Sequence, residues 1–152
     1  MWITRKNRGF TLVELLIAIA IIGILSTVAT VSLTKARRHS RDTKRVSEIQ
    51  QMRNALLIYS NQKATYPAGS TMMLGEGDAQ CLDDSEDGFH TSGACSGLII
   101  MQRVPREIVA GHVPYIYNKT DTGYTISFTL EGAVGDLPGG NCTARPENIT
   151  CS

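Results

Sequence analysis

Residues 10–34 read FTLVELLIAIAIIGILSTVATVSLT, and this stretch decides what class of protein the chain can be. From Leu15 to Thr34 it holds twenty residues without a charged side chain. Twenty helical residues at about 1.5 Å each span about 30 Å, the thickness of the hydrocarbon core of a bilayer. The stretch therefore predicts a membrane-spanning helix and excludes a simple soluble globule. It is also longer than the apolar region of an ordinary signal peptide, about 7–15 residues.

The charge of the chain is divided between two parts. The 152 residues carry 15 basic and 14 acidic side chains, which give a formal net charge of +1. Residues 1–63 hold eleven of the basic and three of the acidic side chains, whereas residues 64–152 hold four and eleven. The near-neutral total does not suggest a nucleic-acid binder, and the split indicates two parts in different surroundings. A hydrophobic content of 42% excludes a mostly disordered chain.

One carboxylate, that of Glu14, lies near the start of the apolar stretch. An ionised group in hydrocarbon costs about 2.5–3.5 kcal/mol on insertion scales, so it normally has a partner. No basic residue inside the stretch is available to pair with it. The residues alone leave two interpretations, a side chain that reaches the headgroups and one that needs a partner from elsewhere.

The residues around Glu14 resemble a known signal. A short basic leader, residues 1–9, ends in Gly9, Phe10 follows, and Glu14 stands four residues after Phe10. This combination resembles the class III signal of type IV prepilins and type II secretion pseudopilins. The resemblance implies that a prepilin peptidase of the inner membrane cuts between Gly9 and Phe10. It further implies that the new amino terminus, Phe10, is methylated.

The resemblance also implies a partner for Glu14 and a function for the chain. The carboxylate of Glu14 in one subunit would pair with the amine of Phe10 in a neighbour as the helices bundle. The chain would then be a pilin, a structural subunit of a type IV pilus-like helical filament, with no enzymatic activity and no cofactor. A major pseudopilin of a type II secretion or competence pseudopilus is the alternative. A membrane-tethered binding protein or enzyme would have no need for Gly9, Phe10 and Glu14 in this arrangement.

The implied partners are other copies of the chain, the prepilin peptidase and methyltransferase, an inner-membrane assembly platform, an assembly ATPase and minor pilins. Three basic residues precede the apolar stretch and six follow it, and a count of flanking charges would place the C-terminal side in the cytoplasm. The resemblance implies the opposite orientation. The chain would cross the inner membrane once before assembly, with its head outside the cytoplasm, and then enter an extracellular or periplasmic filament.

The helix is expected to continue beyond the membrane. Residues 35–63 contain neither Pro nor Gly, and they predict an amphipathic extension of the helix from Phe10 to about Asn61. Its apolar residues recur at spacings of three and four and so share one face: Val46, Ile49, Met52, Leu56 and Tyr59. In the resembled family this second half of the helix packs on a small sheet.

The basic residues between positions 35 and 45 leave three interpretations. They form a solvated helix surface, contact lipid headgroups before assembly, or contact DNA. Charge runs are usually solvated faces, so DNA binding is not indicated.

Residues 64–152 predict a globular head, and the whole chain is therefore expected to be α+β with a pilin-like fold. Residues 124–131 alternate apolar and polar side chains, which predicts a strand with one buried face. Residues 113–117 form a second β-rich run, and the turn residues 120–123 join the two into a hairpin. Residues 67–97, which are rich in glycine and acidic residues, predict a loop.

A short segment before the hairpin extends the resemblance. Residues 101–107 and 114–117 resemble the Leu-Pro-x-Asp-Pro and Pro-Tyr-x-Tyr stretch of major pseudopilins. Glu107 stands where Asp is usual in that pattern, and Ile108 stands where Pro is usual.

The acidic loop offers candidate calcium ligands in Asp83, Asp84 and Asp87, because carboxylate oxygens are the ligands that calcium prefers. Their spacing does not match an EF-hand loop, and a solvated acidic loop is the favoured interpretation.

Four cysteines allow three pairings. The pairs Cys81–Cys95 and Cys142–Cys151 close the shortest loops, and disulfides would agree with export to an oxidising compartment. In many pilins a C-terminal disulfide closes a surface loop, which the pair Cys142–Cys151 would resemble.

Overall fold

A computed structural model describes residues 9–109 and 111–152 of the chain. The basic part of the leader, residues 5–8, therefore lies outside the described residues. Within them, the helix α1 (Leu12–Lys63) precedes a head made of short strands and loops. The chain divides into two compact units, one that ends at Arg37 and one that spans Arg38–Ser152. The second half of α1 therefore belongs to the same unit as the head, and the membrane boundary expected at residue 34 stays a prediction.

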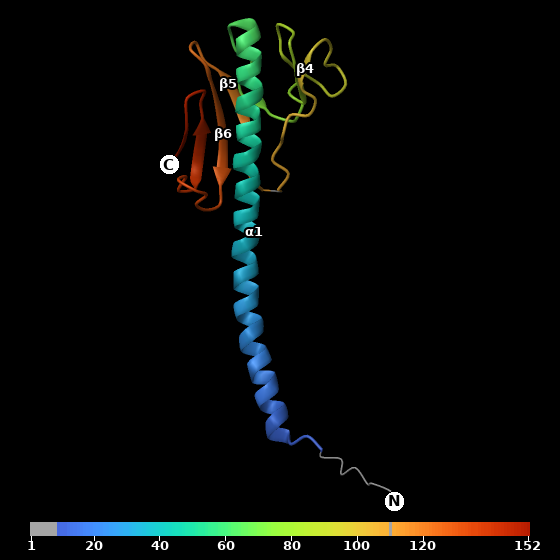
Figure 1. The fold of residues 1–152 in the computed structure, drawn as a ribbon, viewed down its shortest axis with the longest axis vertical. Coiled ribbons are helices and arrows are strands. Elements are labelled where there is room, and N and C mark those ends of the chain that lie inside the picture. The colour runs from blue at the N-terminus through green and yellow to red at the C-terminus, as the bar shows by residue number, and fades with distance from the viewer. Residues whose placement is uncertain (1–8, 110) are drawn as a thin grey trace, which may run out of the picture. The chain divides into compact units, whose positions relative to one another are not determined.

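The head contains two antiparallel sheets. The larger one has the strand order β1-β5-β6-β7-β8, and the smaller one has the order β3-β2-β4. Figure 1 shows β5 and β6 on one side of α1 and β4 on the other. The strands span the following residues: β1 (Met72–Met73), β2 (Cys81–Asp83), β3 (Phe89–His90), β4 (Ile99–Met101), β5 (Ile116–Lys119), β6 (Tyr124–Leu130), β7 (Gly140–Ala144) and β8 (Ile149–Cys151).

The predicted hairpin is confirmed. β5 pairs with β6 through Lys119 and Tyr124, which leaves residues 120–123 as the connecting turn. Along β6 the side chains alternate strictly between buried and half-buried, as the period-two pattern indicates. β5 begins three residues later than the predicted run 113–117 and ends two residues later. The later start agrees with Pro114, which has no N–H to donate to a strand ladder.

One expectation for the head was wrong, and some strands were not predicted. Residues 67–97 contain β1, β2 and β3, strands of only two or three residues each, which are too short to show an alternating pattern. The last two strands, β7 and β8, were not predicted either. They form a second hairpin in which Cys142 stands opposite Cys151.

The apolar face of the helix forms the core of the head, as predicted. Ile49, Met52, Leu56 and Tyr59 are each at most 1% exposed, and Val46 packs at the edge of the same cluster. From the strands they meet a mixed aliphatic and aromatic layer: Leu82, Phe89, Tyr117, Tyr124, Ile126, Phe128 and Leu130. The fold class is therefore confirmed as α+β, with a long helix packed against antiparallel sheets.

A close approach at Gly88 ties the acidic loop to this helix. Gly88 has a positive φ of 74°, and an added Cβ would lie 2.9 Å from carbon atoms of Tyr59 and Pro67. The hydroxyl of Tyr59 donates to the backbone carbonyls of Ser85 and Glu86, each at 2.9 Å. Only glycine fits a left-handed position so close to an aromatic ring.

Candidate functional site

The candidate site residues at the N-terminus, Gly9, Phe10 and Glu14, lie in the first turn of α1 or directly before it. Gly9 and Phe10 precede α1 and are exposed, Phe10 to 87%. The carboxylate of Glu14 accepts hydrogen bonds from the backbone N–H and the hydroxyl of Thr11, both at 2.9 Å. The hydroxyl of Thr11 in turn accepts from the backbone N–H of Glu14 at 3.2 Å. This reciprocal pair is a capping box, so the helix begins at Leu12 rather than at Phe10.

The capping box gives Glu14 a structural role that the sequence reasoning missed. The pattern Thr-x-x-Glu directly before an apolar run is itself a signal for such a cap, and it is present at residues 11–14. The cap uses one carboxylate oxygen, Oε2. The second oxygen remains available for the pairing with a neighbouring amine that the resemblance implies.

The apolar half of α1 is exposed along its whole length. α1 is long and apolar enough to cross a membrane, and no residue of its most apolar 18-residue window is buried. Large side chains such as Leu12, Ile17 and Ile24 are 55–74% exposed. Apolar side chains in this number are stable only in lipid or against other apolar surfaces. The first unit therefore needs an apolar surrounding that the chain itself does not supply.

The basic segment between residues 35 and 45 is only partly a solvated surface. Arg45 is 2% exposed and Asp42 is 1% exposed, and both point into the head. Arg45 donates to Glu107 at 2.5 Å, to Asp42 at 2.7 Å and to Glu131 at 3.0 Å. Solvation was therefore the wrong interpretation for Arg45, because its guanidinium is needed to neutralise buried carboxylates.

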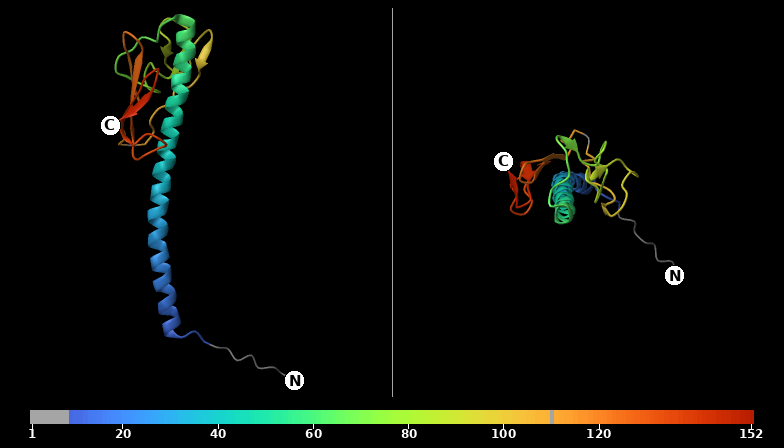
Figure 2. Two further views of the ribbon diagram at one scale, coloured as in Figure 1. Left: turned by 60° about the vertical axis from the view of Figure 1, so that its left-hand side comes forward. Right: turned by 90° about the horizontal axis from the view of Figure 1, so that it is seen from above.

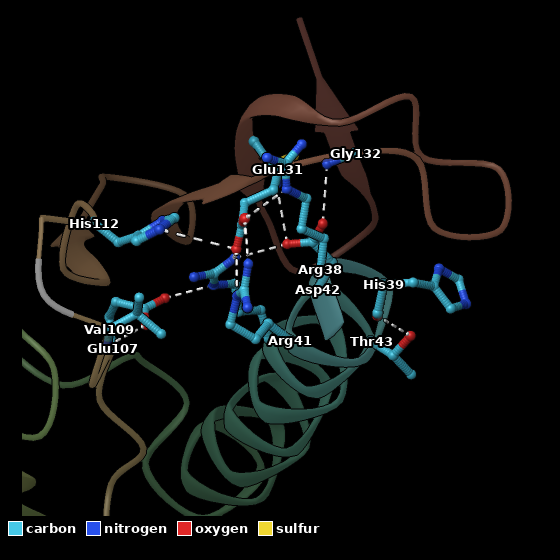
Figure 3. A network of polar contacts seen from close by, with 12 residues as sticks. Arg38, His39, Arg41, Asp42, Thr43, Glu107, Val109, His112, Glu131 and Gly132 are labelled. Atoms are coloured by element: carbon cyan, nitrogen blue, oxygen red, sulfur yellow. Dashed lines mark hydrogen bonds and ion pairs between the residues drawn. The ribbon is translucent and has the colours of Figure 1, made fainter. Parts of the chain in front are cut away.

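Further contacts extend this network over the end of β6. Arg41 holds the carboxylate of Glu131 with two hydrogen bonds of 2.7 and 2.6 Å. Asp42 accepts from the backbone N–H groups of Glu131 at 3.0 Å and of Gly132 at 2.9 Å. Figure 3 shows Arg41 and Asp42 of α1 converging on Glu131, with Arg38 and His112 at its margin. We call Arg41, Asp42, Arg45, Glu107 and Glu131 the charge network.

The charge network shifts the pKa values of its acidic members. The hydrogen bonds from Arg41, joined by those from Arg45 and opposed by burial, lower the pKa of Glu131 to about 2. Burial would raise the pKa of Glu107, but its hydrogen bonds with Arg45 and the N–H of Val109 outweigh that effect and lower it. Both carboxylates are therefore held ionised at neutral pH, where they pair with Arg41 and Arg45.

These shifts predict that the head loses stability in acid. A carboxyl whose pKa is lowered in the folded state adds stability that is complete above its unfolded pKa and is lost as the pH falls toward its folded pKa. For Glu131 this range runs from its ordinary value of 4.5 down to about 2. We expect the unfolding free energy, measured with urea, to fall through this range. Glu131→Gln should be less stable than wild type at neutral pH, and its unfolding free energy should change less with pH below 4.5. An unchanged pH dependence would contradict the assignment of this acid sensitivity to Glu131.

Two of the three calcium candidates, Asp83 and Asp84, accept hydrogen bonds inside the acidic loop, whereas Asp87 is exposed. Asp83 is fully buried, and its carboxylate accepts from the backbone N–H groups of Ser85 at 2.9 Å and Ser96 at 2.8 Å. The carboxylate of Asp84 accepts from the N–H of Leu98 at 3.0 Å. Among the described residues, no group of three or more potential metal ligands lies together. The structure thus does not bring Asp83, Asp84 and Asp87 together as a metal site.

The four cysteines form two disulfides, Cys81–Cys95 and Cys142–Cys151. The first closes the loop that follows β2 around the buried carboxylate of Asp83, and the second joins β7 to β8. Each bridge holds irregular or edge structure that buries few apolar side chains of its own.

We expect removal of the C-terminal bridge to destabilise the head. A disulfide that closes a loop of nine residues typically adds about 2–4 kcal/mol, mainly by restricting the unfolded chain. The double variant Cys142→Ser with Cys151→Ser should show this loss in urea unfolding. Wild-type protein under non-reducing conditions should contain no thiol that reacts with an alkylating reagent. Labelling of two or more cysteines in native protein would contradict both bridges.

The comparison with known proteins supports the prepilin-type signal that the sequence indicates around Gly9, Phe10 and Glu14. Residues 4–30 match the family model of the prokaryotic N-terminal methylation motif. The chain is 38% identical over 64 residues to the type II secretion system core protein G of Escherichia coli. The aligned segment covers 42% of this chain and 44% of that protein. The resemblance to the pilin and pseudopilin family predicted from the sequence is thereby confirmed.

Two further relatives define the range of the similarity. The type IV major pilin protein PilA of Myxococcus xanthus is 34% identical over 61 residues, which are 40% of this chain and 28% of that protein. Core protein G of the Vibrio cholerae type II secretion system is 33% identical over 63 residues, 41% of this chain and 43% of that protein. The chain thus spans less than half the length of the curated relatives that it matches. No solved structure matches the chain significantly.

Proposed function

We propose that this chain is a pilin, a structural subunit that polymerises into a type IV pilus-like helical filament. The observation that carries the proposal is the exposed apolar half of α1, which directly follows Gly9 and Phe10 within the match to the methylation motif. A helix that crosses the membrane before assembly can later bury the same side chains against the helices of other subunits. The chain contributes surfaces to this process rather than catalytic groups.

The partners follow from the same proposal. A prepilin peptidase cuts between Gly9 and Phe10 and methylates Phe10, and the head faces away from the cytoplasm. An assembly platform and an assembly ATPase of the inner membrane, together with minor pilins, then bring subunits into the filament. The carboxylate of Glu14 meets the amine of Phe10 of a neighbour. Two observations support this arrangement, the free oxygen of Glu14 beside the cap and the exposure of Phe10.

A major pseudopilin is the second candidate function. It is favoured by the identity to type II secretion core protein G in two organisms. A pilin and a major pseudopilin share processing, methylation and polymerisation. They differ in the location of the filament, which is outside the cell for a pilus and in the periplasm for a pseudopilus. Surface filaments in the sheared fraction would support the pilus, and filaments confined to the periplasm would support the pseudopilus.

We expect the mature protein to begin at N-methylated Phe10. The test is mass spectrometry of the intact protein from membranes and from filaments. Co-expression with a prepilin peptidase should remove residues 1–9 and add one methyl group, whereas Gly9→Val should leave the leader in place because the small residue before the cut is lost. A wild-type chain that keeps Met1, or one that is cut beyond Ala20 by ordinary signal peptidase, would contradict the proposed function.

A further inference from the structure

A groove lies where α1 meets the side of the head that carries the smaller sheet. It has a volume of about 930 Å³ and is lined by Lys44 and Glu48 of α1, and by residues of β2, of the loop after β3 and of the segment 102–108. The view from above in Figure 2 shows the yellow part of the chain, around residue 100, on the other side of α1 from the red C-terminal strands. A volume of this size is typical of ligand-binding clefts, which measure about 300–1,000 Å³.

The groove gathers cations in a head that is otherwise acidic. Residues 64–152 hold eleven acidic and only four basic side chains. Two of those four, Arg103 and Arg106, line the groove together with Lys44 of the helix, and we call it the basic groove. Among the described residues, the one carboxylate that lines it belongs to Glu48, which already pairs with Lys44 at 3.4 Å. Arg103 and Arg106 are exposed and form no ion pair with any described residue, so their charge is available to an anionic ligand.

A smaller cavity of about 190 Å³ adjoins the basic groove. Four residues line both hollows: Lys44, Glu48, Arg106 and Ile108. Arg45 also lines the cavity, and its Nη2 is the one buried side-chain nitrogen or oxygen to which the described residues offer no hydrogen-bond partner. A buried donor of a charged group is costly without a partner, and an acceptor that enters the cavity would supply one.

The charges of the cavity favour an ionised acceptor over a neutral one. Its lining contains four cations and two carboxylates, which are Arg41, Lys44, Arg45 and Arg106 against Glu48 and Glu107. Hydrogen bonds between an ionised donor and an ionised acceptor are about twice as strong as those between neutral groups. The cavity therefore extends the preference of the basic groove for an anion.

The lining of the groove distinguishes between classes of anionic ligand. In the described part of the chain no aromatic ring lines it, so a nucleic-acid base would find no surface on which to stack. A free phosphate ion would leave two exposed side chains of the lining uncovered, those of Ile99 at 45% and Ile108 at 66% exposure. A peptide with both carboxylate and apolar side chains can pair with the arginines and also cover the isoleucines.

We infer that the basic groove binds an acidic peptide segment of another protein. Carboxylates of the segment pair with Arg103 and Arg106, and one carboxylate enters the cavity and accepts from Nη2 of Arg45. The acidic surface of the rest of the head repels such a segment, which confines it to the groove. This inference goes beyond the proposed function, because it concerns the head alone and holds whether or not the chain polymerises.

A second copy of this chain is a poor source of the segment. All exposed acidic residues in the described part of the head lie in turns or bends, among them Glu86 and Asp87. Such turns present one or two carboxylates each. A groove with three cations suits an extended segment that carries several carboxylates.

Isothermal titration calorimetry of the full-length protein in a non-ionic detergent tests the inference. The probe is a hexapeptide in which Glu and Leu alternate, with both ends blocked, and the control peptide has Gln in place of Glu. We expect the Glu peptide to bind saturably at one site, less tightly as salt is added, and the Gln peptide not to bind. Because the Gln peptide is the less polar of the two, association with the detergent cannot explain such a difference.

Variants locate the site on the head. Arg103→Gln and Arg106→Gln should each weaken binding about fivefold, the upper range for an exposed ion pair, whereas Lys119→Gln removes an exposed cation outside the groove and should change nothing. Ile108→Asp places a negative charge between groove and cavity and should abolish binding. Val113→Asp, at an exposed apolar position outside both hollows, should not. Equal thermal unfolding of the variants shows that the head still folds.

NMR spectra of protein with isotope-labelled arginine test the cavity. The Glu peptide should shift the side-chain N–H signals of Arg45. It should leave those of Arg53 unchanged, because Arg53 donates to the backbone carbonyls of Arg145 and Pro146 outside the groove. Unshifted signals of Arg45 would contradict a carboxylate in the cavity.

Several results would overturn the inference. Wild type would fail to bind the Glu peptide, or would bind the Gln peptide equally well, or Lys119→Gln would weaken binding as much as Arg103→Gln. Displacement of the Glu peptide by a lower concentration of inorganic phosphate, an acidic oligosaccharide or a single-stranded oligonucleotide would assign the groove to that anion instead. Self-association of wild type that Ile108→Asp abolishes would assign it to a second copy.

Discussion

Replacing Arg45 by methionine should lower the free energy of unfolding of the head by about 3–5 kcal/mol, because it removes the cation from a buried group of carboxylates. Arg45 donates to Glu107, Asp42 and Glu131, and its own side chain is only 3% exposed. Methionine keeps much of the packing volume of the arginine stem. The loss is therefore an effect of charge, measured as a lower midpoint and a lower extrapolated free energy in urea unfolding of the full chain.

Arg41 offers a matched control on the same helix. Its side chain is 36% exposed, and it also holds Glu131 with two hydrogen bonds. Because water can replace part of its contribution, Arg41→Met should cost about 1 kcal/mol, the usual upper range for an exposed pair. Comparable losses for the two variants would show that burial of Arg45 is not the cause.

A double variant separates the unpaired carboxylate from the lost arginine. Asp42 keeps its two backbone N–H donors when Arg45 is removed, and Glu131 keeps Arg41. Glu107 keeps only the hydrogen bond from the N–H of Val109, so it is the carboxylate of the charge network that the loss of Arg45 affects most. Adding Glu107→Gln to Arg45→Met should restore part of the lost stability. A double variant that is weaker than the single one would contradict this explanation.

The parts of the fold that were predictable from the sequence are those with a long, regular pattern. The helix, its buried face from Val46 to Tyr59 and the strand β6 each repeat a period over enough residues to identify it. The strands β1 to β4 were missed because two or three residues cannot show a period. The hairpin of β7 and β8 was missed because β7 begins with Gly140 and Asn141, two residue types that are depleted in strands.

The charge network was hidden for a different reason. Arg45 is separated from Glu107 by 62 residues and from Glu131 by 86, so no local spacing connects them. Sequence reasoning treats a run of basic residues as solvated, and that holds for Lys35 and Arg37, which are exposed. From the sequence, Glu107 was only a departure from a family pattern. In the structure its carboxylate accepts a hydrogen bond from the buried guanidinium of Arg45. Tertiary contacts decide the role of a charge, and they can be found only once the strands are placed.

We expect Glu14→Gln to abolish or strongly slow filament assembly while leaving membrane insertion and leader cleavage intact. An amine of Phe10 without its carboxylate would remain charged in the apolar interior of the filament. An ionised group in such surroundings costs about 2.5–3.5 kcal/mol, which corresponds to a loss of about 100-fold in an equilibrium constant. Insertion should not suffer, because the substitution removes a charge from the apolar stretch.

The capping box makes glutamine the right substitution. Glutamate and glutamine both serve at the third position of such a cap, so Glu14→Gln keeps the hydrogen bond from the N–H of Thr11 and removes only the charge. Thr11→Ala provides the reverse control. It removes the hydroxyl that accepts from the N–H of Glu14 but leaves the carboxylate in place. Loss of such a cap costs about 1 kcal/mol, so Thr11→Ala should weaken the first helical turn and still assemble.

The two variants separate four possible roles of Glu14 in one experiment, which compares leader cleavage by gel shift with filament yield in the sheared fraction. A defect in assembly for Glu14→Gln alone supports pairing with the amine of Phe10, because only the charge has changed. A defect for Thr11→Ala of the same size would instead assign the effect to the cap. Normal filaments from Glu14→Gln would refute the pairing, and the carboxylate would then be one that reaches the headgroups before assembly. If the Glu14→Gln variant keeps its leader, Glu14 acts in recognition by the peptidase. The pairing of Glu14 with the amine of Phe10 is then tested with Glu14→Gln in a chain that is produced with Phe10 already at its amino terminus.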